Sequence, residues 1–335
     1  MTRPNPHPAI AVSWGDPAGI GPETVLKAFG LLPKGVRRRI VLHADPAYMT
    51  ALDARLGTGV PMAPERDAGF DDDLLRIAPL SRPVKFDFDR DFGKEKKAFG
   101  AAAIESVERA MDAVLCGQAD ALVTAPINKA SVNKAGFHVP GHTEFLAQRA
   151  GVEEVVMMLT GRELSVVVVT THHRLADVPA LLTKEKIVAT LTIVDASFKR
   201  FGIARPRLAV TGLNPHASDH GVFGDEEARI IAPAIKAARK KGIDATGPFP
   251  ADTMFSPAAR KTYDCAVAMY HDQGLIPIKT LSFGETVNVT LGLPFLRVSV
   301  DHGTAFDIAG TGRADGAPMR HAIMTARAML AGRMR

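Results

Sequence analysis

The sequence predicts an α/β protein with two domains. Short apolar runs rich in β-branched residues alternate with longer runs of helical period, which is typical of a mostly parallel sheet covered by helices. The 335 residues are 46% hydrophobic and 23% charged, so the chain can bury one large core or two modest ones. We therefore expect two ordered α/β domains.

Six strands are expected, at residues 9–14, 39–44, 121–126, 164–171, 207–212 and 265–270. Helices are expected over 24–32, 99–117, 186–202 and 318–330. In the third of these, Ile187, Leu191 and Val194 fall on one helical face, which indicates an amphipathic covering helix. Residues 31–99 have weaker periodicity and are expected to hold edge strands and surface loops.

Composition and charge exclude several classes of protein. The longest apolar runs are far below the roughly 20 residues that a membrane helix needs, and no secretory signal is visible, so we expect a cytoplasmic protein. Cys116 and Cys265 lie in apolar surroundings and are expected to be buried thiols. The net charge of +5 comes partly from basic runs at 37–39 and 239–241, which we interpret as solvated helix ends rather than a nucleic-acid surface.

Three histidines stand at or just after the ends of separate predicted strands. His172 ends one run, His216 follows the next, and His271 ends a third. Ligands bind at the carboxyl ends of strands in α/β sheets, so the three side chains can converge from distant positions. A three-histidine site suits a divalent metal ion and leaves coordination positions open for substrate. Three structural histidines are the alternative.

Two glycine-rich segments each join a strand to a helix. The first, GDPAGIGPE at 15–23, matches neither the Walker nor the G-x-G-x-x-G pattern, so an anion-binding loop and a tight structural turn both stay open. The second, within residues 301–315, is too long for a plain connection between the last strand and the last helix. A bound cofactor would explain its composition.

Further polar residues are candidates for substrate contacts. In PGHTEF, at 140–145, His142 and Thr143 stand at an expected helix start, where helix capping and substrate contact are both open. Lys279, Asn288 and Arg297 interrupt apolar runs that we interpret as strands. A cation there needs a buried or ligand anion, such as phosphate or carboxylate, unless the side chain reaches solvent from a sheet edge.

Seven blocks, in order, resemble the 4-hydroxythreonine-4-phosphate dehydrogenase family: SWGDPAGIGPE, TAPINK, GHTEFLA, TTH, LNPHA, YHDQGLIPIK and DHGTAFDIAGTG. The resemblance covers residues 10–312. It implies the two-domain isocitrate/isopropylmalate dehydrogenase-like α/β/α fold, with the active site in the interdomain cleft at a dimer interface. We expect residues 1–130 plus 285–335 to form the nucleotide domain, and residues 131–284 to carry the metal, substrate and dimer contacts.

Position by position, the resemblance implies roles for the candidate residues. One divalent ion (Zn, Mg or Co) would be bound by His172, His216 and His271, at a site shared across a homodimer. Substrate would contact His142, Thr143, Lys279, Asn288 and Arg297. NAD or NADP would contact Gly303, Thr304, Asp307 and Gly310. The resemblance does not assign the general base that the reaction needs; Asp272, next to His271, and His142 are the candidates, with Asp252 as another. LNPHASDHG departs from the family's more usual LNPHAGEGG-like run, which bears on substrate specificity.

The implied reaction is metal-assisted oxidation of 4-phosphooxy-L-threonine by NAD(P), giving 2-amino-3-oxo-4-phosphooxybutanoate. That product decarboxylates to 3-amino-2-oxopropyl phosphate, in pyridoxal 5'-phosphate (vitamin B6) biosynthesis. Close relatives act on 4-phospho-D-threonate, 4-phospho-D-erythronate or cyclic dihydrodiols, and these alternatives stay open. Two other classes also stay open: an acyl-phosphate transferase of similar superfold, and a metal-dependent phosphate-ester hydrolase.

Overall fold

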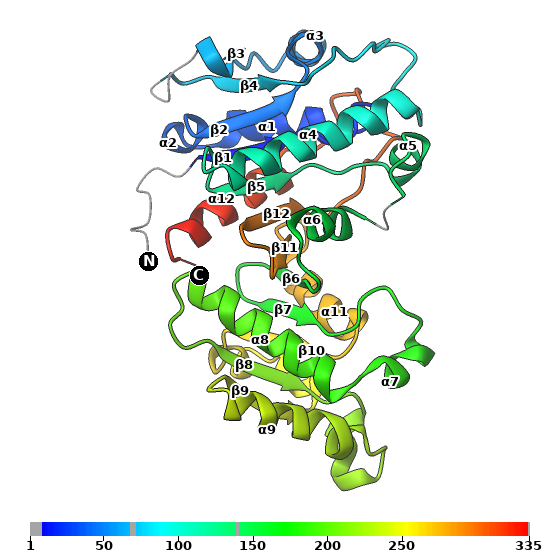
Figure 1. Ribbon diagram of the computed structural model, residues 1–335, viewed down its shortest axis with the longest axis vertical. Coiled ribbons are helices and arrows are strands. Elements are labelled where there is room, and N and C mark those ends of the chain that lie inside the picture. The colour runs from blue at the N-terminus through cyan, green and yellow to red at the C-terminus, as the bar shows by residue number, and fades with distance from the viewer. Residues whose placement is uncertain (1–8, 68–71, 139–140, 334–335) are drawn as a thin grey trace. The chain divides into compact units, whose positions relative to one another are not determined.

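The computed structural model describes residues 9–67, 72–138 and 141–333, in two compact units (Figure 1). Unit 1 comprises Met1–Gly151 and Leu293–Ala331, and unit 2 comprises Val152–Gly292 and Gly332–Arg335. The chain therefore passes between units after residues 151 and 292, later than the boundaries at 130 and 284 that the sequence suggested. Both units are α/β, as expected.

Unit 1 contains a parallel sheet, to which the described residues contribute six strands. Their order is β3 (Met62–Pro64), β4 (Leu75–Pro79), β2 (Ile40–Ala44), β1 (Ile10–Ser13), β5 (Ala121–Thr124) and β12 (Leu296–Val300). Strands β1, β2, β5 and β12 are buried along their whole length. Continuous apolar runs of this kind are typical of parallel strands covered on both faces.

The helices of unit 1 in the described residues are α1 (Gly21–Leu31), α2 (Lys34–Arg37), α3 (Pro46–Leu56), α4 (Lys97–Leu115), α5 (Lys129–Lys134), α6 (His142–Ala150) and α12 (Ala317–Leu330), with a short 3₁₀ turn, η1 (Glu65–Asp67). Helices α3, α4 and α12 pack on this sheet, whereas α1 packs on α12 and α3, and α5 packs on α4. Helix α12 packs on β12 and α1, and α4 packs on β1 and β2. Helix α3 shows how local chemistry sets a helix start: the Asp45 carboxylate caps its first amides and Pro46 begins it.

Unit 2 contains a mixed sheet. Its described strands run in the order β11 (Val287–Leu291), β6 (Val156–Thr160), β7 (Ser165–Val168), β10 (Cys265–Ala268), β8 (Arg207–Thr211) and β9 (Asp244–Phe249). Strand β6 is antiparallel to both β11 and β7, and β7, β10, β8 and β9 are mutually parallel.

The helices of unit 2 are α7 (Val178–Leu181), α8 (Lys184–Arg200), α9 (Ala232–Lys240), α10 (Ala251–Met254) and α11 (His271–Ser282). Shorter turns are η2 (Leu175–Asp177), η3 (Pro215–Gly221), η4 (Glu227–Ile231) and η5 (Ala259–Lys261). Helix α11 buries Leu275 and Ile278 in the core cluster that contains Val166 and Val168 of β7. This packing fixes the helix that His271 begins.

All six predicted strands and all four predicted helices are present. Two expectations were wrong. Lys279 lies in helix α11 rather than in a strand, because the buried residues Leu275, Ile278 and Ser282 repeat every three or four positions. Cys116 is exposed, because it is the C-cap at the end of α4, where the chain leaves the sheet surface. No helix in the described residues has both the length and the apolar character needed to cross a membrane.

Candidate active site

The two glycine-rich segments of unit 1 lie against each other. The backbone amide of Ile20 donates to the carbonyl of Thr304 at 2.9 Å. A Cβ atom on Gly19 would lie 2.9 Å from the same carbonyl oxygen, so the close approach requires glycine there. Residues 15–23 and 301–315 therefore form one continuous structure, although almost 300 positions separate them in the sequence.

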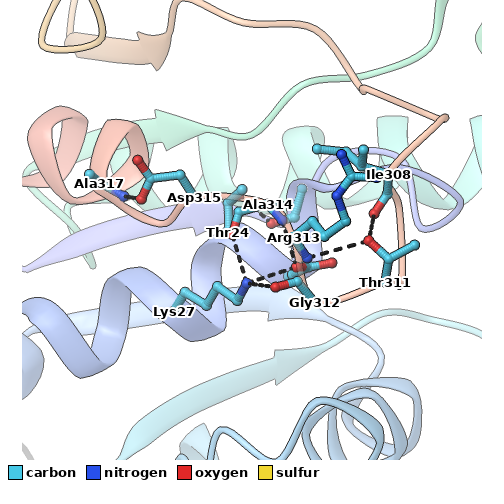
Figure 2. A network of polar contacts seen from close by, with 11 residues as sticks. Thr24, Lys27, Ile308, Thr311, Gly312, Arg313, Ala314, Asp315 and Ala317 are labelled. Atoms are coloured by element: carbon cyan, nitrogen blue, oxygen red, sulfur yellow. Dashed lines mark hydrogen bonds and ion pairs between the residues drawn. The ribbon is translucent and has the colours of Figure 1, made fainter.

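Helix α1 anchors the far end of the second segment, as Figure 2 shows. The ammonium group of Lys27 donates to the carbonyls of Gly312 and Ala314 at 2.6 and 2.7 Å. Glu23, one turn earlier and paired with Lys27 at 3.0 Å, accepts from the backbone amide of Ala314. Sequence reasoning missed this anchor. The only signal was the Glu-Lys spacing of four residues on one helix.

The first segment itself has the geometry of a tight turn. Gly15 has φ of +79°, and a Cβ atom there would lie 2.4 Å from the carbonyl oxygen of Pro126. The Asp16 carboxylate accepts from the amide of Ala18 at 2.8 Å. Asp16 is fully buried, and this burial raises its pKa to about 6 despite that hydrogen bond. The segment thus satisfies one of its own amides with its own side chain.

A buried cation lies elsewhere in unit 1, on β12. Arg297 is 2% exposed and donates to the Thr124 hydroxyl at 2.8 Å. Burial lowers the pKa of Arg297 to about 10, and the carboxylate of Glu144 opposes that shift, so the guanidinium stays charged at neutral pH. Neighbouring β5 supplies Thr124, in the segment TAPINK.

His142 begins helix α6 and carries no charge at neutral pH. Burial, and then the charge of Arg297, lower the pKa of its imidazole to about 3. Its Nε2 atom is buried and has no hydrogen-bond partner among the described residues. Gly141 is the N-cap and Thr143 is the second residue of α6, so Thr143 does not occupy the capping position. Pro140 lies outside the described residues.

The three histidines follow three adjacent parallel strands of unit 2, β7, β10 and β8. The rings of His172 and His271 lie 5.3 Å apart between centroids. Asp272 contacts Nδ1 of His271 at 2.7 Å, an arrangement that orients an imidazole and leaves Nε2 for a ligand. His216 lies in η3, with its ring 6.2 Å from that of Phe223.

These donors suit a divalent ion in kind, because imidazole nitrogen binds zinc and cobalt. Within the described residues, however, no group of three or more His, Cys, Asp or Glu side chains is arranged to hold a metal ion. A single chain therefore brings two of the three expected imidazoles side by side.

A family model described as pyridoxal phosphate biosynthetic protein PdxA matches residues 39–326. The chain belongs to the PdxA family. Its curated relatives include 4-hydroxythreonine-4-phosphate dehydrogenases of Geobacter metallireducens, 46% identical over 97% of this chain and 96% of that protein, and of Bradyrhizobium diazoefficiens, 47% identical over 97% of each. A solved structure of the enzyme named 4-hydroxythreonine-4-phosphate dehydrogenase from Klebsiella pneumoniae has a TM-score of 0.89 and 39% identity, covering 96% of this chain and 99% of that one.

More distant structures bear on the alternatives to a PdxA activity. A terephthalate 1,2-cis-dihydrodiol dehydrogenase from Burkholderia xenovorans is 30% identical, with a TM-score of 0.68 over 95% of this chain and 97% of that one. A phosphotransacetylase from Staphylococcus aureus shares the fold alone, at 15% identity and a TM-score of 0.54 over 96% of this chain and 94% of that one.

The remaining predicted site residues of this PdxA chain are half-buried or exposed. Lys279 on α11 and Asn288 on β11 are half-buried in unit 2, and the Asn288 Oδ1 atom is buried without a hydrogen-bond partner in the described region. Asp252 and Asp272 are exposed. In the second glycine-rich segment, Gly303 and Asp307 are exposed, whereas Thr304 and Gly310 are half-buried.

Proposed function

We propose that this chain is a 4-hydroxythreonine-4-phosphate dehydrogenase. It oxidises 4-phosphooxy-L-threonine with NAD or NADP to 2-amino-3-oxo-4-phosphooxybutanoate, which decarboxylates to 3-amino-2-oxopropyl phosphate in pyridoxal 5'-phosphate biosynthesis. The observation that carries the proposal is the 46–47% identity to dehydrogenases of that name over nearly the whole chain. It acts in the cytoplasm as a homodimer of isocitrate/isopropylmalate dehydrogenase-like subunits, with the site in the interdomain cleft at the dimer interface.

The nicotinamide cofactor binds along the joined glycine-rich segments of unit 1. Gly303, Thr304, Asp307 and Gly310 contact it. Support comes from the fixed geometry of that structure, since Lys27 and Glu23 of α1 hold residues 312–314 by three hydrogen bonds. A positioned loop contributes more to affinity than a mobile one, because its ordering entropy is not lost on binding.

Arg297, His142, Thr143, Lys279 and Asn288 bind the phosphorylated hydroxy amino acid. Arg297 contributes a permanent buried charge for phosphate or carboxylate. His142, neutral beside it, contributes a hydrogen bond; a pKa of about 3 makes it a weak proton acceptor at neutral pH. Among the three candidate bases, this favours Asp272, which also orients His271, over His142; Asp252 stays a candidate.

His172, His216 and His271 hold one divalent ion, Zn, Mg or Co, in a site shared by two subunits. When bound, the ion polarises the substrate hydroxyl and lowers its pKa. Two observations support a shared site. Among the described residues of one chain, His172 and His271 lie together, and no group of three or more His, Cys, Asp or Glu is arranged to hold a metal ion. Unit 2 also exposes large apolar side chains suited to a subunit contact: Leu175, Val222, Phe223, Ile276 and Phe283.

The test is reduced-nicotinamide absorbance with 4-phosphooxy-L-threonine, 4-phospho-D-threonate and 4-phospho-D-erythronate, each with added divalent metal and after chelation. We expect metal-dependent turnover of the amino acid. Turnover of a sugar acid alone would make the chain a 4-phospho-D-threonate or 4-phospho-D-erythronate dehydrogenase. This activity is the second candidate because the sequence Ser218-Asp219-His220 beside His216 is unusual for the family. Absence of NAD reduction with all three would sink the dehydrogenase proposal and favour a transferase or hydrolase.

A further inference from the structure

A pocket of about 800 Å³ lies along helix α4 in unit 1. Its walls come from β2, the end of β4, one face of α4, and α6, which Figure 1 labels. None of the residues assigned above to substrate, metal or cofactor lines it. Its size is within the range of small-molecule sites in proteins.

His43, on β2, lines this pocket. The side chain is 5% exposed, and neither ring nitrogen has a hydrogen-bond partner among the described residues. Buried polar atoms are nearly always hydrogen-bonded in folded proteins, so two unsatisfied nitrogens on one buried ring indicate a missing partner. The backbone of His43 is fixed, because the Ser106 hydroxyl donates to its carbonyl at 2.6 Å and accepts from the amide of Trp14 at 3.1 Å.

The imidazole of His43 is neutral at physiological pH. Burial, and then the charge of Arg109, lower its pKa to about 4. A neutral imidazole has one N–H donor and one acceptor nitrogen. A hydroxyl group can bond to either nitrogen, because its one oxygen atom both donates and accepts; it satisfies one of the two, since they point in different directions.

The pocket walls carry an excess of negative charge. The two guanidinium groups are already paired: Arg109 with Glu105 at 2.8 Å, and Arg149 with Glu108 at 3.1 Å and Asp112 at 2.9 Å. Glu65 adds a fourth carboxylate to the lining. Four carboxylates against two guanidiniums repel a phosphorylated metabolite and attract a cation, although the whole chain has a net charge of +5.

The lining also includes apolar surface, from Ala78, Pro79, Ala101 and Phe137. We propose that the α4 pocket is a second ligand site, for a small amine that carries a hydroxyl group on an apolar body. The ammonium group lies among the carboxylates and the hydroxyl group bonds to His43.

The probes are three ligands of similar shape, titrated into the full-length protein with ¹⁵N-labelled histidine. Tyramine has both the ammonium and the hydroxyl, phenethylamine lacks the hydroxyl, and 3-(4-hydroxyphenyl)propionate replaces the ammonium by a carboxylate. The readout is the side-chain resonances of His43, assigned by their loss in His43→Phe. Tyramine should shift them and bind about two- to tenfold more tightly than phenethylamine, the range for one hydrogen bond.

The propionate should leave His43 unchanged, and Glu65→Gln should weaken tyramine binding by a few-fold. Equal shifts from all three ligands, or none at millimolar concentration, would overturn the proposal. If His43→Phe does not fold, the affinities of the three ligands for the wild-type protein, measured by calorimetry, decide the question in the same order. Failure here leaves the dehydrogenase assay unaffected, because the two sites share no residue.

Discussion

Replacing His220 by glycine should stabilise the protein. Five consecutive non-glycine residues, His216 to His220, have φ between +43° and +70°. An L-residue in this left-handed region is disfavoured by about 1–2 kcal/mol, because its Cβ approaches the following carbonyl. Glycine removes that term but adds about 0.4–1 kcal/mol of chain entropy to the unfolded state. The His220 side chain is exposed, so little packing is lost, and the net gain is about 0.5–1 kcal/mol.

Thermal and urea unfolding measure the effect, with His220→Ala as the matched control. Alanine removes the imidazole but keeps the Cβ, so it should give no stabilisation, whereas glycine should raise Tm by about 1–4 °C. Ser218→Gly should gain less, because the Ser218 hydroxyl accepts from the amide of Gly221 at 3.2 Å. Equal stability of the glycine and alanine variants at position 220 would refute the argument from strain.

Other substitutions test the site directly. Arg297→Lys should lower kcat/KM for the phosphorylated substrate about 10- to 100-fold, since an ammonium cannot reproduce the planar guanidinium fork; exposed Arg205→Lys should not. The pKa of Asp16 is raised to about 6, so its contribution to stability is present below pH 3.8 and lost as pH rises through 6. Urea unfolding should therefore show Asp16→Asn more stabilising at pH 8 than at pH 4, by up to about 3 kcal/mol. The pKa of His142 is lowered, so its contribution to folding stability is lost as pH falls from 6.5 towards 3. His142→Gln should therefore lose less stability on acidification than the wild-type protein, as measured by the urea midpoint. Gly310→Ala would place a Cβ 2.2 Å from the Phe92 ring and should weaken NAD binding in a titration, whereas Gly312→Ala, with a nearest neighbour at 3.8 Å, should weaken it much less.

The six predicted strands were recognisable because each is a short run buried almost throughout, as is typical of strands in a sheet covered on both faces. Residues 271–281 were harder, since a short apolar run has no clear period and Pro277 argues against a helix. The helix is stabilised because Leu275 and Ile278 pack against β7. Tertiary contacts therefore supply what local pattern lacks.

The same limit applies to the candidate site. Sequence patterning placed His172 and His271 at the ends of two predicted strands, and the adjacency of β7 and β10 in the sheet brings them side by side. The left-handed turn that carries His216 could not be predicted, because five consecutive non-glycine residues rarely adopt positive φ, and Ala217 and Ser218 do so least readily. The unsatisfied nitrogens of His43 were equally invisible, since only packing shows which polar atoms lack a partner.

The pairing of Arg297 with His142 has a consequence for pH dependence. Burial lowers the pKa of both groups. The guanidinium of Arg297 stays charged, because its pKa of about 10 is still above neutral pH. The imidazole of His142 is neutral, because its pKa of about 3 is far below neutral pH. Neither group titrates between pH 5 and 8, so the charge that this pair offers to the proposed substrate is constant across that range. Any change in substrate affinity there must come from other groups, among them the substrate phosphate, whose second pKa is about 6.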